Sequence, residues 1–288
     1  MKICITTDST SDIPVSLQKE LGISVLPLLI ETEKGEYLDG VTITTDTFYE
    51  ELLKYSQLPS SASVTPLNYL ALYEEKLEQG YTDVIHVSLN GEGSSTYQNA
   101  CLGRDFFYHD HPELEGDFHI HCLDSGTYSM GYGLGVVQAA RMARDGKNPE
   151  EIIAFLQDWI EHNVVLFCPL ELNFVRRSGR VSGAAAFIGD ALGLKPVITF
   201  DHGAAKTLLK ARGEKMAMRE MLKLVVSQHK PGTPVAIAGA MDENVNEAWS
   251  AAVRNTVQDV SEFIDFKLGC VITINSGPKA FGVVFRKE

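Results

Sequence analysis

A short loop at residues 90–96 combines glycine and hydroxyl side chains between an apolar strand and a helix. The β-branched residues of 82–88 predict a buried strand, and the helix is expected from Thr96 onward. Gly91 and Gly93 allow the backbone to turn tightly, while the hydroxyl groups stand beside the free N–H groups of the helix start. The loop is therefore suited to bind a carboxylate or a phosphate, although a simple N-cap explains the same residues.

Three other hydroxyl-rich segments are expected near this loop. Residues 6–12 follow the strand predicted at 2–6, and residues 124–127 follow the strand predicted at 118–123. A fourth cluster, residues 60–63, lies just before a predicted helix. Because the loops of an open parallel sheet gather at its carboxyl edge, where ligands bind, these segments predict one shared site.

Composition limits the class of protein and its partners. The chain has 288 residues, 44% of them hydrophobic, which is enough for two domains with substantial cores. No run of about eighteen apolar residues and no secretory signal is present, so we expect a cytoplasmic protein without stable membrane insertion. A formal charge of −13 argues against nucleic acid or an anionic membrane as partner. The five cysteines have no paired metal spacing, which predicts free thiols and no metal site.

Alternating strands and helices in the first part of the chain predict an α/β domain, doubly wound around a mostly parallel sheet. From about residue 163 the pattern changes to that of an α+β domain, so we expect domains at 1–162 and 163–288 that pack directly on each other. The strands expected in the second domain include 196–200, 234–240, 263–268, 271–274 and 281–285, and the apolar run 23–30 is expected as one element of the first.

Six segments in the same order resemble the DegV family of bacterial fatty-acid-binding proteins. They are residues 7–14, 94–98, 124–133, 178–181, 194–196 and 277–283, so the resemblance extends from end to end. Members of this family are similar to the acyl-carrying subunit of bacterial fatty acid kinase, which encloses a fatty acid between two domains. The resemblance implies that this chain is a lipid carrier, not a catalyst, that it needs no cofactor besides the bound fatty acid, and that it presents the carboxyl group to a separate kinase for acyl phosphate formation.

The resemblance also implies a set of head-group residues. The family's carboxylate ligands correspond to Ser61, Ser94 and Arg180 of this sequence. Ser63 and Thr96 are further uncharged donors suited to a carboxylate.

The most pointed of several departures from the family pattern is at position 275. Asn275 stands in Asn-Ser-Gly-Pro where the family has His-Thr-Gly-Pro, so its amide is expected to face the carboxylate, or else to serve only as a turn residue. Arg212 matches a family arginine that resembles a contact for the kinase. Asp8 and Asp124 would repel a carboxylate, so we expect them to hold the loops through backbone N–H groups.

Two enzyme classes remain as alternatives. The glycine-containing loop could bind a nucleotide or another phosphate ligand, but neither dinucleotide-binding nor P-loop spacing is present. Ser9 or Ser94 could act as the nucleophile of a serine hydrolase, but no Gly-x-Ser-x-Gly elbow surrounds them. His119 and His121 alternate along a predicted strand, and with two neighbouring histidines they could bind a metal only if further ligands joined them.

The apolar lining for an acyl chain is not evident from the pattern. Several residues are apolar enough to line a slot, although core packing explains most of them equally well. These residues are Phe106, Phe107, Phe174, Phe187, Ile188 and Leu192.

Overall fold

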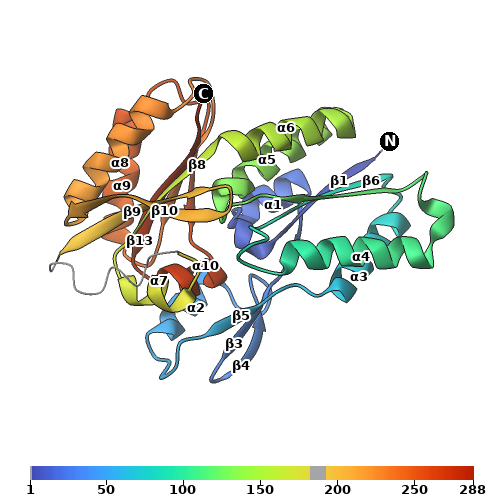
Figure 1. The fold of residues 1–288 in the computed structure, drawn as a ribbon, viewed down its shortest axis with the longest axis horizontal. Helices are drawn as coiled ribbons and strands as arrows, with labels where there is room; N and C mark the ends of the chain where they lie inside the picture. Colours follow the sequence, from blue (N-terminus) through green and yellow to red (C-terminus); the bar gives the residue numbers. More distant parts are fainter. Residues whose placement is uncertain (1, 182–192) are drawn as a thin grey trace.

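Three β-sheets organise the chain in the computed structural model, which describes residues 2–181 and 193–288 (Figure 1). The parallel sheet has the order β2-β1-β6-β7, a small antiparallel sheet has the order β4-β3-β5, and a larger sheet has the order β10-β9-β8-β13-β11-β12. The candidate site lies where these three sheets approach one another, so their arrangement positions its residues.

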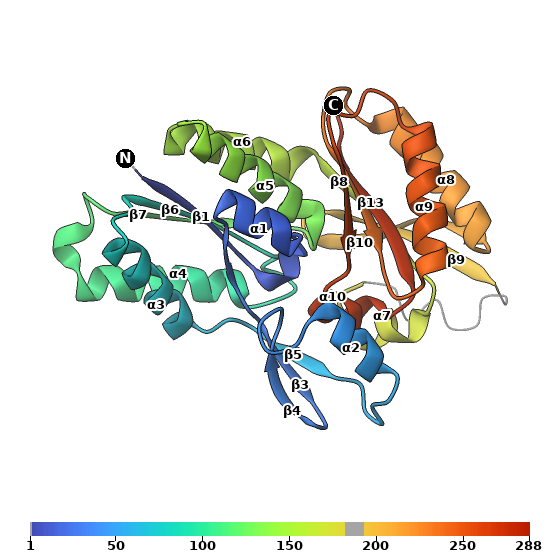
Figure 2. The same cartoon turned by 180° about the vertical axis from the view of Figure 1, so that it is seen from behind.

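The parallel sheet carries helices on both faces, as the sequence predicts. Its strands are β1 (Ile3–Asp8), β2 (Ser24–Leu26), β6 (Asp83–Ser88) and β7 (His119–Asp124). One face is covered by α1 (Val15–Leu21), α5 (Met130–Arg144) and α6 (Pro149–His162), and the other by α3 (Pro66–Glu78) and α4 (Thr96–Asp110) (Figures 1 and 2). Alternate residues of the strands reach opposite faces: Ile5 and Ile85 pack with α5, whereas Cys4 and Val84 pack with α3 and α4.

The apolar run 23–30 does not form one element, which corrects the sequence expectation. Its first part is β2, and its second part belongs to β3 (Leu29–Thr32) of the small sheet. Pro27 lies between them, and since proline has no N–H to give to a ladder, the pairing breaks there. The small sheet is completed by β4 (Gly35–Leu38) and β5 (Ser60–Ala62), and α2 (Thr45–Leu52) lies between these two strands in the chain.

The larger sheet has one face against α5 and the other against α8 (Glu214–Gln228) and α9 (Glu243–Thr256) (Figure 2). All of its pairs are antiparallel except β11 with β12. Its strands are β8 (Asn163–Pro169), β9 (Leu194–Asp201), β10 (Ala204–Arg212), β11 (Val235–Gly239), β12 (Phe263–Lys267) and β13 (Ala280–Arg286).

The expected strand at 271–274 is wrong, because these residues lie within helix α10 (Cys270–Ser276). A short apolar run has the same pattern in a buried helix and in a buried strand, so the sequence does not distinguish the two. Helix α10 packs Cys270 and Val271 into the same core cluster as Leu26 and Tyr49, far from its neighbours in sequence. The C-terminal part of the chain therefore contributes to the core of the N-terminal part.

A second core cluster also joins the two parts of the chain. It combines Ile85 of the parallel sheet with Ala236 and Phe266 of the larger sheet, through the buried face of α5. The boundary proposed between residues 162 and 163 falls at the junction of α6 and β8. The two sheet units are thus packed directly on each other.

Candidate functional site

A cavity of about 300 Å³ lies between the inner face of the larger sheet and the loops at the carboxyl edge of the parallel sheet. Strand β5 and helix α10 also contribute to its wall through Ser61 and Val271. Three of the segments that the sequence singled out reach this one cavity, through Thr10, Ser61 and Ser94, and the fourth leads to it through Tyr128, which directly follows it. The expectation of a single shared site is therefore met in its geometry.

The floor of the cavity is apolar and comes from the larger sheet. Val165, Leu166 and Phe167 of β8 line it, and Leu166 also belongs to the core cluster of the opposite face, with α8 and α9. Gly282 of β13 lies beside Phe167 on one side and beside Ala238 of β11 on the other. These two small residues on neighbouring strands leave the space above the sheet unfilled.

Hydroxyl groups from three elements meet at one end of the cavity. The Oγ atoms of Ser63 and Ser94 are 3.2 Å apart, and the Ser94 Oγ lies 2.9 Å from the Oγ1 of Thr96. Ser61, Ser63 and Ser94 line the cavity, whereas Thr96 is fully buried behind Ser94. The structure thus brings the predicted serines together at this end of the cavity, which we call the serine end. Thr96 does not line the cavity, but its hydroxyl is hydrogen-bonded to that of Ser94.

Arg180 is the only charged residue among the described residues that line the cavity. Its Nη1 donates to the Oδ1 of Asn275 at 3.2 Å and to the carbonyl oxygen of Ser178 at 2.9 Å. The Nδ2 of Asn275 donates to the carbonyl oxygen of Val271 at 2.8 Å. Asn275 therefore holds the guanidinium at the serine end, with one N–H of its amide still available.

Two aspartates, the fully buried Asp8 and the half-buried Asp124, hold the loops in place, as expected. The Oδ2 of Asp8 accepts from the Leu89 N–H at 2.9 Å, and its Oδ1 accepts from the Thr10 N–H at 3.1 Å. The Oδ1 of Asp124 accepts from the N–H groups of Gly91 and Gly126, both at 3.0 Å. Neither carboxylate lines the cavity, so the loops are fixed without adding negative charge to it.

Tyr128 is a site residue that the sequence reasoning missed. Its hydroxyl accepts from the Nδ2 of Asn90 at 3.0 Å, and its ring lies 4.9 Å from the ring of Phe200. A side chain at Gly93 would collide with this hydroxyl, so glycine is required there for the close approach. Burial raises the pKa of Tyr128, which keeps its proton on the oxygen. The only sequence signal is the position of Tyr128 just after the hydroxyl-rich turn at 124–127.

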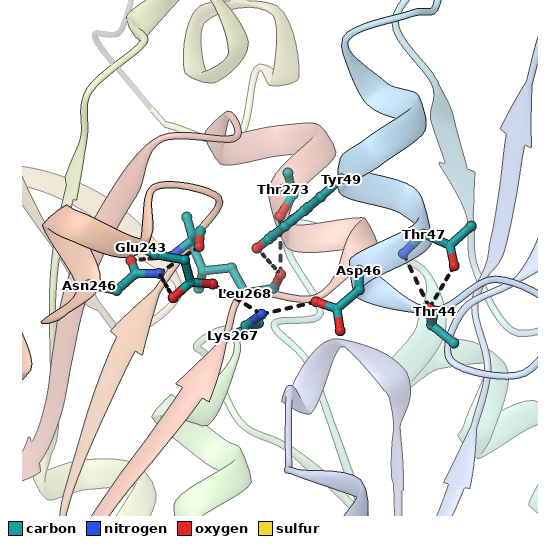
Figure 3. A network of polar contacts seen from close by, with 10 residues as sticks. Thr44, Asp46, Thr47, Tyr49, Glu243, Asn246, Lys267, Leu268 and Thr273 are labelled. Carbon is teal, nitrogen blue, oxygen red and sulfur yellow. Dashed lines mark hydrogen bonds and ion pairs between the residues drawn. The ribbon is translucent and has the colours of Figure 1, made fainter.

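Helix α10 is held by a polar network between the two parts of the chain (Figure 3). The hydroxyl of Tyr49 on α2 donates to the carbonyl oxygen of Leu268 at 2.7 Å, and Thr273 donates to the same oxygen at 3.2 Å. Just before it, Lys267 pairs with Asp46 of α2 at 3.0 Å and with Glu243 of α9 at 3.2 Å. This network fixes the start of the helix whose far end carries Asn275.

The expected acyl lining differs from the lining in the structure. Phe106 is exposed on α4, while Phe107 and Phe174 are buried without reaching the cavity. Phe187, Ile188 and Leu192 lie outside the described residues. The residues that do line the floor come from strands whose patterns indicate only a buried sheet.

The other candidate chemistries find little support in the geometry. Among the described residues, no histidine hydrogen-bonds Ser9 or Ser94, and no group of three metal-binding side chains is present. His86 is fully buried on β6 between Thr6, Tyr69 and Ser88, and burial lowers its pKa to about 3.

Arg212 ends strand β10 and is exposed, away from the cavity. Its position on the surface is compatible with contact to another protein. In the described parts of the chain, none of the helices has the length and apolar character needed to cross a membrane.

Comparisons with known proteins agree over the full length. The family model described as "Uncharacterised protein, DegV family" matches residues 2–288. A DegV domain-containing protein of Caldanaerobacter subterraneus is 32% identical over 293 residues, covering 100% of this chain and 99% of the relative. The structure of a DegV family protein from Thermus thermophilus, described by its fatty acid binding, has a TM-score of 0.90 at 29% identity and full coverage of both chains. That of DegV from Bacillus subtilis, described as a fatty acid binding protein, has a TM-score of 0.85 at 26% identity, again with full coverage of both. Since sequence and fold both match over the whole chain, this protein belongs to the DegV family.

Proposed function

We propose that the chain binds a long-chain fatty acid in the cavity, with the carboxylate at the serine end and the tail over the larger sheet. The observation that carries this proposal is the polarity of the cavity. Its floor is apolar, and the single charged residue among its described lining, Arg180, is a cation beside Ser94 and Asn275. A carboxylate with a long apolar tail has the matching distribution of charge.

The tail supplies most of the binding free energy. Burying roughly fourteen methylenes at about 0.8 kcal/mol each gives on the order of 11 kcal/mol before ordering costs. The head needs only enough donors to satisfy a partly buried carboxylate, and Ser61, Ser63 and Ser94 can provide these. The Ser61 hydroxyl has no hydrogen bond to another described residue, so it is available to a ligand.

We further propose that the chain is a carrier, which presents the carboxylate to a separate fatty acid kinase for acyl phosphate formation. Arg180 is exposed, so the head-group end of the cavity lies near the surface, where a second protein can reach it. Arg212 is assigned to the docking surface for that kinase. The role needs no cofactor within the chain and places it in the cytoplasm with the kinase and its ATP.

Mass spectrometry under native conditions tests the binding step. Freshly purified protein is expected to carry a mass of about 250 to 300 Da that is released on delipidation, because tight apolar burial survives purification. A bound nucleotide, or release of free acid from generic esters, would contradict the proposal.

A coupled assay tests the presentation step. Delipidated protein is loaded with palmitate and mixed with a bacterial fatty acid kinase and ATP, and acyl phosphate is measured. The expected result is formation of acyl phosphate that requires both proteins. If the loaded protein binds palmitate but gives no product with any kinase offered, binding stands and presentation is contradicted.

A further inference from the structure

A second cavity, of about 500 Å³, lies on the other side of the contact between the two sheet units. It is lined by the segment after β1, including Ile13, and by β11 and β12 of the larger sheet. Two residues, Ala238 and Phe266, line both cavities. These two side chains therefore stand between the two spaces.

The position of Phe266 follows from the order of the larger sheet. The floor of the first cavity passes from Phe200 on β9, across β8, β13 and β11, to Phe266 on β12. Phe200 contacts Tyr128, whose hydroxyl packs against Gly93, so the β9 side lies close to the serine end. Strand β12 is the edge strand on the opposite side, and there the ring of Phe266 is only 6% exposed. Phe266 is thus the far wall of the cavity.

The second cavity could receive an apolar chain end. Each charged residue in its lining has a partner. Asp12 accepts from the Gly269 N–H and the Ser129 hydroxyl, and Lys267 is paired with Asp46 and Glu243. Asp265 is paired with Arg254, and Asp39 is hydrogen-bonded to Ser9. The rest of the lining combines apolar side chains, Ile13, Val25 and Val41 among them, with uncharged polar side chains such as Gln18 and Asn246. No cation free of an acidic partner lines it among the described residues, so a second carboxylate has no counterpart there.

We infer that Phe266, together with Ala238, sets the longest acyl chain that the protein accepts. The ring of Phe266 stops the methyl end in the first cavity, and without this ring the two cavities join. The inference rests on the proposed fatty acid binding and adds the residue that determines its chain-length limit.

The test measures binding of delipidated protein to a series of saturated fatty acids from laurate to behenate. In the wild type, each added methylene tightens binding by up to about fourfold until the cavity is full, after which affinity no longer rises. Phe266→Ala is expected to move this limit to longer chains by at least two methylenes. Phe167→Ala is the matched control, since Phe167 lines only the first cavity and its loss is expected to leave the limit at the far wall unchanged.

A variant of opposite sign covers the case in which Phe266→Ala does not fold. Ala238→Leu adds side-chain volume at the same partition, so it is expected to lower the limit by one or two methylenes while laurate still binds. Circular dichroism confirms that each variant is folded before titration.

The outcomes separate this inference from the function on which it rests. A wild type that binds no fatty acid overturns the proposed function. A wild type that binds, with the same limit in the wild type and in the folded Phe266 and Ala238 variants, overturns the inference alone. A limit that moves equally in Phe167→Ala also overturns it, because cavity volume in general would then set the chain length.

Discussion

Replacing Ser94 by alanine removes the central hydroxyl of the serine end of the cavity. The Ser94 Oγ lies 3.2 Å from the Oγ of Ser63 and 2.9 Å from the Oγ1 of Thr96, so it connects the residue that follows β5 to the start of α4. In the ligand-bound protein the same hydroxyl is expected to donate to the carboxylate. The change is therefore a loss of one donor, without a change in the apolar floor.

The size of the effect follows from the charge of the acceptor. A hydrogen bond to a charged group contributes about 1.5 to 3 kcal/mol, which corresponds to a loss in affinity of about 10- to 150-fold. Ser63 and Arg180 remain, which favours the lower half of this range. In the lipid-free protein the buried Thr96 hydroxyl loses its partner, so unfolding is expected to become easier by about 1 kcal/mol.

The assay compares delipidated wild type and Ser94→Ala by titration with palmitate and with the corresponding fatty alcohol. The alcohol has a neutral head, so the variant is expected to lose less affinity for it than for palmitate. Ser227→Ala, on the exposed surface of α8, is the matched control and should bind palmitate as the wild type does. A change of less than twofold in palmitate affinity for a folded Ser94→Ala would refute the assignment of Ser94 to the head group.

Three further predictions address charge. The asparagine at position 275 does not titrate, so the palmitate affinity of the wild type should be nearly constant from about pH 6 to pH 8. Asn275→His should bind palmitate more tightly toward pH 6, because the imidazole becomes cationic there. Superimposable pH profiles of the two proteins would place this residue away from the carboxylate. Arg212→Ala should leave palmitate binding intact and lower acyl phosphate formation. The control is Arg219, an exposed arginine of α8, and Arg219→Ala should change neither quantity. Loss of palmitate binding in Arg212→Ala would contradict a docking role. Burial lowers the pKa of His86 to about 3, so below about pH 6.5 the unfolded chain takes up a proton at this residue that the folded chain does not. The wild type should therefore lose about 2 kcal/mol of stability from His86 between pH 7 and pH 5. Urea unfolding at several pH values should show this loss and a smaller one in His86→Gln, and equal losses would contradict it.

The sequence predicts the parallel sheet and its loops well because both depend on local signals. Asp8 and Asp124 follow their strands directly, and their carboxylates hold the neighbouring loops as expected. The serine end can be predicted equally well, since Ser63 and Ser94 lie in hydroxyl-rich segments that a parallel sheet brings to one edge.

The cavity floor could not be predicted, because it depends on two small residues at positions where a larger side chain would fill the space. Gly282 and Ala238 look like ordinary small residues of buried strands, and only the pairing of β13 with β11 places them side by side. Tyr128 has the same difficulty: nothing in its local pattern shows that Asn90 will hold its hydroxyl. Contacts between strands and loops distant in sequence determine both features.

Helix α10 has a consequence for protein synthesis. Its residues Cys270 and Val271 complete a core that otherwise consists of N-terminal elements, and its Asn275 holds Arg180. While residue 276 of a nascent chain is still inside the ribosome, this part of the core is missing and Arg180 lacks its hydrogen bond to Asn275. If the chain binds a fatty acid as proposed, binding has to follow translation of this segment, and a ribosome-bound fragment would not withdraw fatty acid from the cell's pool.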